Sequence, residues 1–523
     1  MFEAPEIAWQ YLAPVIAVLG AGVLGVLVEA FVPARTRRIV QVVLALVALV
    51  GAFVAVLLLW PAVADSGGTA VLGGVLVVDA PALVLQGMIA FVGIVAFLVI
   101  ADRTASGEDA FAPSAAAVPG SDYEAEAQRR GLTQTEVFPL VLLSLGGMMI
   151  FPAAGDLLTL FVALEVLSLP LYLLVGMARR RRLLSQEASM KYFLLGAYAS
   201  GFLLFGTALL YGYAGSVRLA DIAAAAGTVS DQEPLLLAGL VLVLVGLLFK
   251  VAAFPFHSWT PDVYQGAPTA ITGFMAACTK IAAFGAMLRL VYVVLPPLEW
   301  DIMPVLWGVA VLTMVVGTVV AIVQTDIKRM LAYSSIAHAG FVLVGVVALT
   351  SSGISGVLFY LLAYGLATVG AFAVVTLVRE VNVGTGGAVV AEATHLSQWA
   401  GLGRRHPVLA AVFTLFLLSF AGIPLTGGFT GKFAVFSAAV EGDLTWLAVV
   451  GVVASAAAVF FYVRLVVLMF FTDPVGTPGE ATTVVRGTLT MVAIGIAAVG
   501  TVLLGVLPSP VLELFGDAAR FLP

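Results

Sequence analysis

The sequence has little charge and almost no cysteine. Only 10% of its 523 residues are charged, and Cys278 is the single cysteine. One thiolate cannot build an iron–sulfur centre, a cysteine zinc site or an internal disulfide bond, so we interpret Cys278 as a packing residue. No GxxxxGK[ST] motif is present, and no GxGxxG motif has a strand–helix context. Nucleotide hydrolysis and dinucleotide binding are therefore not expected, and the lack of HExxH spacing predicts no metal site.

Lysine is also scarce. Arginine supplies most of the 24 basic residues and serves as the ordinary surface cation. The five lysines are Lys191, Lys250, Lys280, Lys328 and Lys432. Lys250, Lys280 and Lys432 lie inside apolar runs, where a cation is expensive and is by default a functional hypothesis. Lysine suits such a place because burial lets it release its proton, whereas arginine stays charged.

Long apolar runs dominate the rest of the chain. Hydrophobic residues make up 62% of the sequence, and the mean hydropathy is +1.13. The runs are continuous, as in membrane helices, and not alternating, as in outer-membrane barrels. The first ten residues contain Glu3 and Glu6 but no basic residue, unlike the cationic start of a cleaved signal peptide. We therefore expect the first apolar run to stay in the protein as a helix. The sequence predicts an all-α polytopic membrane protein with about 14 transmembrane helices, at 11–32, 39–60, 80–101, 137–153, 157–177, 190–213, 235–256, 268–295, 302–323, 329–349, 355–379, 407–438, 444–471 and 487–508.

Basic residues gather in alternate loops of this scheme. Even-to-odd loops and the termini hold only Arg218 and Arg520 and are otherwise acidic or neutral. By the positive-inside rule the basic loops face the cytoplasm, and both termini face outside. We expect a multi-pass protein of the bacterial cytoplasmic membrane. The basic loops contain Arg35, Arg37, Arg38, Arg103, Arg129, Arg130, Arg179, Arg180, Arg181, Arg182, Lys328, Arg329, Arg379, Arg404, Arg405 and Arg486.

The chain divides into four parts. Residues 1–136 hold three helices and a polar cytoplasmic loop (102–136), which we expect to contain a short helix near 123–130. Residues 137–295 and 302–471 form two five-helix halves, and 487–523 form the last helix and tail. Each half has a helix interrupted by Pro and Gly, at FKVAAFPFH (249–257) and FAGIPLTGGFTGKF (420–433). Interrupted helices at corresponding places, with an odd number of helices per half, favour inverted repeats around a site inside the membrane, with broken helices 7 and 12.

One carboxylate lies near the middle of the fifth run. Glu165 precedes Pro170, which cannot donate a helical hydrogen bond and so loosens the helix there. A buried carboxylate without a partner would be driven neutral, and we choose Lys250 as its partner. Movement of Glu165 toward or away from Lys250 would switch that lysine between holding and releasing a proton. The alternative is an ion pair with a purely structural role.

The remaining candidates divide into buried and interfacial residues. Snorkelling to the membrane surface fits Lys191 at a helix start, and Lys328 is interpreted as part of a solvated cytoplasmic turn with Asp326 and Arg329. His257 and His338 lie at or within runs and could shuttle protons, although a buried histidine is as often a packing residue. Four hydroxyl-bearing residues could hold water along a polar axis: Thr279, Tyr333, Ser334 and Ser335.

Four stretches carry a resemblance to a known family. They are LLFKVAAFPFHSWTPDVYQGAPTAITGFMAACTKIAAF (247–284), KYFLLGAYASGFLLFG (191–206), DIKRMLAYSSIAHAGF (326–341) and FAGIPLTGGFTGKF (420–433). Over residues 137 to 470 the chain resembles the antiporter-like membrane subunits of respiratory complex I, an NADH-quinone oxidoreductase. Lys432 matches a lysine that is typical of subunit N, whereas subunit M has a glutamate at this position. Subunit L has a long lateral helix after its last membrane span, and this sequence resembles it less because no such helix follows the last run.

The resemblance implies a fold, a function and partners. It implies fourteen helices with two inverted five-helix repeats, and proton translocation through a central axis of Glu165, Lys250, Lys280 and Lys432, with His257 and His338 as further members. The energy would come from redox chemistry elsewhere: NADH, FMN, iron–sulfur clusters and quinone would belong to other subunits, and this chain would hold no cofactor. Its partners would be those membrane and peripheral subunits and membrane lipid, with no nucleic acid.

Two other functions remain open on the sequence. A subunit of a multi-subunit Mrp-type cation/proton antiporter shares the lysines but typically differs around WTPDVYQGAPT. A membrane scaffold would make the buried charges dispensable.

Overall fold

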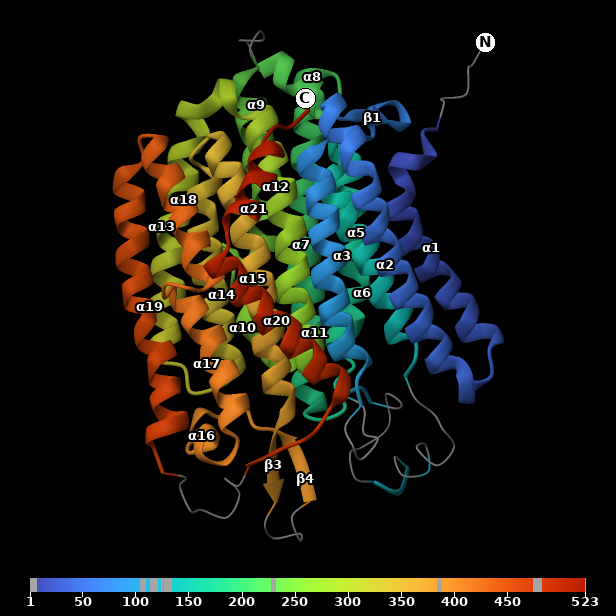
Figure 1. Ribbon diagram of the computed structural model, residues 1–523. Helices are drawn as coiled ribbons and strands as arrows, with labels where there is room; N and C mark the ends of the chain where they lie inside the picture. The colour runs from blue at the N-terminus through green and yellow to red at the C-terminus, as the bar shows by residue number, and fades with distance from the viewer. Residues whose placement is uncertain are drawn as a thin grey trace.

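The computed structural model describes residues 7–103, 110–112, 121–123, 126, 134–226, 232–382, 388–473 and 482–522. Over these residues it is a bundle of long helices (Figure 1). Each of the fourteen predicted runs is helical along most of its length. Among the described residues, 12 helices are long and apolar enough to cross a membrane, and two shorter apolar stretches occupy Val137–Ala153 and Pro407–Ala421. Most of the short helix expected near 123–130 lies outside the described residues.

The N-terminal segment and the first half supply the helices from α1 to α12. The segment holds three long helices and a small antiparallel hairpin: α1 (Trp9–Phe31), α2 (Ala34–Ser66), β1 (Thr69–Val71), β2 (Leu76–Val78) and α3 (Ala80–Ala101). The first half follows with α5 (Val137–Ile150), α6 (Leu157–Val175), α7 (Arg182–Ala214), α8 (Leu219–Ala226), α9 (Glu233–Val251), α10 (Trp259–Gly266), α11 (Thr269–Phe274), a π-helix (Met275–Thr279) and α12 (Lys280–Val294).

The second half and the C-terminal segment complete the bundle. The half holds α13 (Glu299–Ile322), α14 (Ile327–Val346), α15 (Ser351–Leu377), β3 (Val378–Asn382), β4 (Ala388–Glu392), α16 (Leu402–Arg405), α17 (Pro407–Ala421), α18 (Gly427–Glu441) and α19 (Thr445–Phe471). It is followed by β5 (Thr482–Val484), α20 (Thr488–Val506) and α21 (Ser509–Asp517). Strand β3 pairs antiparallel with both β4 and β5. We call the end of the bundle where β3 and β4 lie the hairpin end (Figure 1).

Both predicted helix breaks are present. The first interruption separates α9 from α10, and the second separates α17 from α18. Gly422 ends α17 with φ 81°, a left-handed conformation that glycine adopts without strain, and its N–H donates to Leu418. A Cβ at Gly422 would lie 2.9 Å from Cδ of Lys432, so a larger residue there would displace the lysine side chain.

The helices differ in how far the protein encloses them. Helices α3, α14 and α15 and the α11–α12 span are surrounded by other helices, whereas α1, α2, α7, α13, α19 and α20 present most of their apolar surface outward. Outward apolar surface is what lipid or a neighbouring membrane chain covers. The enclosed helices therefore form the centre of the bundle.

A buried ion pair fastens the C-terminal tail at the other end of the bundle. Arg289 on α12 donates to Asp79 across 2.7 Å, and both side chains are at most 1% exposed. Asp79 also caps α3 and accepts a hydrogen bond from the backbone N–H of Leu522 at 3.0 Å. Since Phe521 covers the Arg289 guanidinium at 5.1 Å, the tail closes over the pair. The chain thus ends where α8 and β1 lie, at the end opposite β3 and β4 (Figure 1).

Candidate functional site

Lys250 occupies the last turn of α9, just before the first break. Its side chain lies among α6, α7 and α9, and the residue is 2% exposed. The ammonium nitrogen donates to Ser168 Oγ at 2.7 Å and to the Tyr192 hydroxyl at 3.1 Å, and it lies 5.2 Å from the centre of the Tyr192 ring. Neutral hydroxyls and an aromatic face thus hold this buried amine.

Glu165, the predicted partner of Lys250, does not bond to it in this structure. Glu165 is half-buried on α6, and no ion pair joins it to Lys250 or to any other described residue. Ser168 takes the expected place instead, because it lies one turn further along α6 on the same face. Glu165 is still close enough to act on Lys250 electrostatically.

Lys280 begins α12 directly after the π-helix Met275–Thr279. It is 3% exposed, its ammonium donates to the backbone carbonyl of Ser335 on α14, and it lies 5.7 Å from the centre of the Tyr364 ring on α15. The Tyr264 hydroxyl on α10 approaches Ser335 Oγ at 3.5 Å. Short π-helical segments often mark functional sites, and this one sets the start of the turn that carries Lys280.

His338 on α14 is held from both sides by tyrosine. Nδ1 lies 2.6 Å from the Tyr360 hydroxyl and Nε2 lies 3.1 Å from the Tyr462 hydroxyl, which in turn bonds to Ser334. The ring is 3% exposed. Since each ring nitrogen has a hydroxyl partner, His338 can pass a proton through its ring without leaving its place.

Lys432 lies on α18, just after the second break. Its ammonium nitrogen donates to the carbonyls of Phe420 at 2.8 Å and Ala421 at 3.1 Å and to Ser455 Oγ at 2.7 Å. The two carbonyls are at the end of α17, where the interrupted helix leaves them without helical partners. Phe341 on α14 lies 4.9 Å from this nitrogen and packs edge-on against His338, so the two sites adjoin.

His257 is placed apart from this row. It lies in the first break, half-buried, and stacks on Phe254 with the ring centres 5.4 Å apart. Its Nδ1 is buried without a hydrogen-bond partner. Thr279, another predicted member, also has a buried hydroxyl without a partner, whereas Ser334 and Ser335 join the row through Tyr462 and Lys280.

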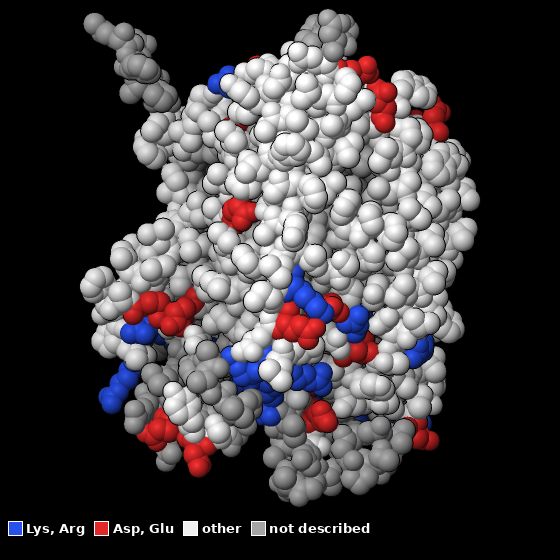
Figure 2. Space-filling view, turned by 180° about the vertical axis from the view of Figure 1, so that it is seen from behind, with Lys and Arg blue, Asp and Glu red and all other residues white. Residues whose placement is uncertain are grey.

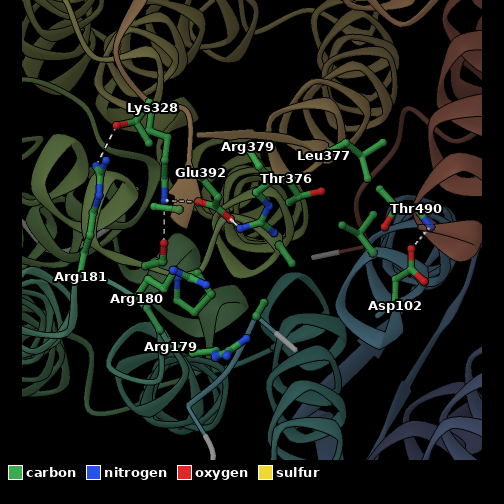
Figure 3. A pocket seen from close by; sticks show the side chains of 18 of the residues that line it. Asp102, Arg179, Arg180, Arg181, Lys328, Thr376, Leu377, Arg379, Glu392 and Thr490 are labelled. Atoms are coloured by element: carbon green, nitrogen blue, oxygen red, sulfur yellow. Dashed lines mark hydrogen bonds and ion pairs between the residues drawn. The ribbon is translucent and has the colours of Figure 1, made fainter. Parts of the chain in front are cut away.

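The interpretation of Lys328 as a solvated residue is wrong. It is 2% exposed, donates to the Ala267 carbonyl at 2.7 Å and lies 3.9 Å from Glu392. Lys328 and Glu392 line a cavity of about 100 Å³ near the hairpin end, together with Arg379 and the turn that carries Arg181 (Figure 3). The sequence placed this lysine between two runs, but the turn at Ala267 and the side chain of Glu392 lie against it.

Sequence reasoning also missed five tyrosines. Tyr192, Tyr264, Tyr360, Tyr364 and Tyr462 each contact one of the buried amines, the ring of His338 or Ser335. The sequence feature that could have identified them is a tyrosine hydroxyl inside an apolar run, because a buried tyrosine hydroxyl usually needs a hydrogen-bond partner. Within the described part of the chain, no group of three or more His, Cys, Asp or Glu side chains is arranged to hold a metal ion.

The fold and this row of enclosed amines define a class: antiporter-like helical membrane proteins with broken helices. Residues 154–458 match a family model described as NADH:quinone oxidoreductase/Mrp antiporter, TM. NADH-quinone oxidoreductase subunit N of Beutenbergia cavernae is 65% identical and is matched over 99% of both chains. The chain belongs to the subunit N family of NADH-quinone oxidoreductases.

Solved structures agree with this assignment. One chain of respiratory complex I from Thermus thermophilus with bound aureothin superposes with a TM-score of 0.75 at 32% identity, over 96% of this chain and 98% of that one. A chain of the Mrp complex from Dietzia sp. DQ12-45-1b gives a TM-score of 0.77 at 22% identity, over 98% and 97%. The second likeness concerns the fold alone.

Proposed function

We propose that this chain moves protons across the membrane as a subunit of respiratory NADH-quinone oxidoreductase. The observation that carries the proposal is the row of buried basic groups from Lys250 through Lys280 and His338 to Lys432, with Glu165 beside its first member. A structural role alone would favour paired charges or apolar side chains at these enclosed positions, because an unpaired buried cation is destabilising. Three lysines without a bonded carboxylate are instead suited to gain and lose a proton.

The polar partners of each amine support a stepwise relay. Lys250 is bound by hydroxyls, Lys280 by a carbonyl, and Lys432 by two carbonyls and a hydroxyl. Each partner stabilises the ammonium but carries no full negative charge, so the lysine can also lose its proton and become a neutral amine. A proton that binds one member of the row repels the positive charge on the next member, because the medium between them has a low dielectric constant. Such repulsion passes charge along the row without large movements of the helices.

Glu165 would supply the trigger at one end. In the position seen here it acts on Lys250 only through space. A shift of α6 that brings the carboxylate into contact would hold the proton on Lys250, and a shift away would release it. Moving one charge against 100 mV requires about 2.3 kcal/mol, which is within the range of such electrostatic changes.

The redox chemistry is assigned to other subunits. Within the described residues no three His, Cys, Asp or Glu side chains are grouped to hold a metal ion, and the one cysteine is buried in the π-helix. Because the chain belongs to the subunit N family, we assign NADH, FMN, iron–sulfur clusters and quinone to partner subunits, with this chain acting as a non-redox part of the translocase. Its outward apolar helices would contact lipid and neighbouring membrane subunits.

The distribution of charge supports one orientation in the membrane. Lys and Arg side chains gather toward the hairpin end, while the opposite end shows mainly Asp and Glu (Figure 2). By the positive-inside rule the hairpin end faces the cytoplasm of a bacterium, and both termini face outside. On this view residues 137–295 and 302–471 are the two inverted halves, and each contributes one broken helix to the row.

Purification of the tagged chain in mild detergent tests the proposal. We expect NADH-dependent quinone reduction to copurify and, after reconstitution into vesicles, to drive proton transport. Copurification with membrane chains alone, and sodium/proton exchange without NADH, would instead establish the Mrp-type function. A tag at either terminus that reacts only from the cytoplasmic side would contradict the orientation.

A further inference from the structure

Helix α10 touches both of the first two lysine sites. At its start, the Trp259 ring stacks on Tyr192, with ring centres 4.7 Å apart and planes 14° from parallel, and Tyr192 bonds to Lys250. Further along, the Tyr264 hydroxyl approaches Ser335, whose carbonyl binds Lys280. A displacement of this eight-residue helix would therefore alter the surroundings of both amines together.

The other side of α10 carries a charged network that joins the two halves. Asp262 accepts from Lys191 on α7 at 2.7 Å and from Arg329 on α14 at 2.7 Å. Arg329 also donates to Gln265 at 3.0 Å, and Gln265 donates to Asp326 at 3.2 Å. We call Asp262, Lys191, Arg329, Gln265 and Asp326 the α10 clamp. One carboxylate in it binds a cation from each half.

The break in the seventh helix explains why a clamp is needed. Residues 252–258 separate α9 from α10, so no continuous helical hydrogen bonding fixes the orientation of α10. Its C-terminal end is held by Lys328, which donates to the Ala267 carbonyl. Its outer side is held by Asp262. Without that carboxylate, Lys191 and Arg329 would repel each other on either side of the short helix.

We propose that Asp262 is a positioning residue that keeps α10 aligned between the Lys250 and Lys280 sites and so couples proton transfer between them. The inference rests on the proposed relay. Asp262 touches neither amine. Its side chain is 33% exposed, and the side chains of Lys191 and Arg329 are exposed to a similar degree. Pairs this exposed contribute little to folding, so loss of the carboxylate should change alignment more than assembly.

Glu187 provides a matched control. It lies on α7, one turn before Lys191, and binds the same ammonium at 2.7 Å, but it makes no contact with α10 among the described interactions. Glu187→Gln therefore removes one carboxylate from Lys191 and leaves the α10 clamp intact. Asp262→Asn removes the carboxylate that joins the halves, and Asp262→Glu returns a charge to the same place.

The experiment measures proton transport and NADH-dependent quinone reduction by the complete complex in vesicles, per assembled complex. We expect Asp262→Asn to lower transport about tenfold, less than the roughly 10²-fold cost of misplacing a reacting group by about 1 Å. Glu187→Gln should stay within about twofold of wild type, and Asp262→Glu should recover at least half of the loss. In the Asp262→Asn background, Arg329→Gln should add little, since the two residues act as one unit.

Three results would overturn the inference. Equal transport in Asp262→Asn and Glu187→Gln would remove any special role of the joining carboxylate. Fewer assembled complexes with unchanged transport per complex would show a purely structural role. Failure of Asp262→Glu to recover transport would mean that alignment by this charge is not what was lost. Lys280→Ala separates the two proposals. Normal proton transport in Lys280→Ala would contradict the relay itself. If Lys280→Ala loses transport but Asp262→Asn transports normally, only the proposed role of Asp262 is contradicted.

Discussion

The two broken helices hold their lysines in different ways. Lys250 precedes the first break and is bound by two side-chain hydroxyls from other helices, with a carboxylate nearby. Lys432 follows the second break and is bound by two backbone carbonyls that the break itself exposes. The first site can be retuned by movement of α6 or α7, whereas the second is fixed by its own chain. We infer that the first break is the site of control and the second is a fixed acceptor.

Removal of the two hydroxyls should have the largest effect on this comparison. In the double variant Ser168→Ala, Tyr192→Phe the Lys250 ammonium loses both of its hydrogen bonds. Each bond to a charged group contributes about 1.5 to 3 kcal/mol, so we expect proton transport per complex to fall at least about tenfold. Quinone-linked transport in vesicles measures it. Wild-type transport would show that Lys250 does not depend on side-chain acceptors.

Gly422→Ala should damage the second site through the backbone. The residue has φ 81°, and the new Cβ would meet the Lys432 side chain at 2.9 Å. We expect about 1 kcal/mol or more of destabilisation and a clear fall in transport. Gly516→Ala is the control, because a Cβ there meets nothing within 4 Å. Thermal unfolding of the purified complex compares the two, and equal stability and transport would contradict a constrained second break.

Ser455→Ala should have a smaller effect than the double variant at the first site. It removes the one side-chain acceptor of Lys432 and leaves both carbonyls in place. We expect transport to fall less than in the double variant, because one hydrogen bond is lost instead of two and both carbonyls still bind the ammonium. A loss as large as that at the first site would mean that the carbonyls do not hold the amine.

The coupling between Glu165 and Lys250 should be the smallest effect. The two residues form no ion pair in this structure but would meet during the proposed switching, so a double-mutant cycle with Glu165→Gln and Lys250→Ala should give an interaction energy of at least about 0.5 kcal/mol in transport. Strict additivity would remove Glu165 as a control group. A value of several kcal/mol would show that they form a direct pair during turnover.

The sequence predicted the helices and their breaks well because both depend on local features. Continuous apolar runs mark the spans, and Pro255 and Gly422 mark the interruptions. It also predicted that Lys250, Lys280 and Lys432 are enclosed. These residues stand out because a charge in an apolar run is rare and needs an explanation.

The partners of these residues could not be predicted, because they come from distant segments. Tyr462 lies 124 residues from His338, and Ser168 lies 82 residues from Lys250. In so apolar a sequence most helices are hydrophobic all round, so periodicity does not show which side faces which neighbour. The buried pair of Arg289 and Asp79, 210 residues apart, and the enclosure of Lys328 escaped for the same reason.

The most direct test of the relay compares Lys280→Arg with Lys280→Ala in the complete complex. Arginine keeps the positive charge beside Ser335 but does not release its proton, whereas alanine removes the charge. Proton transport per assembled complex and per NADH oxidised is the quantity to measure in vesicles. If Lys280 carries protons, both variants lose transport. If Lys280 is only a structural cation, Lys280→Arg retains transport, and the relay through the centre of the bundle is wrong.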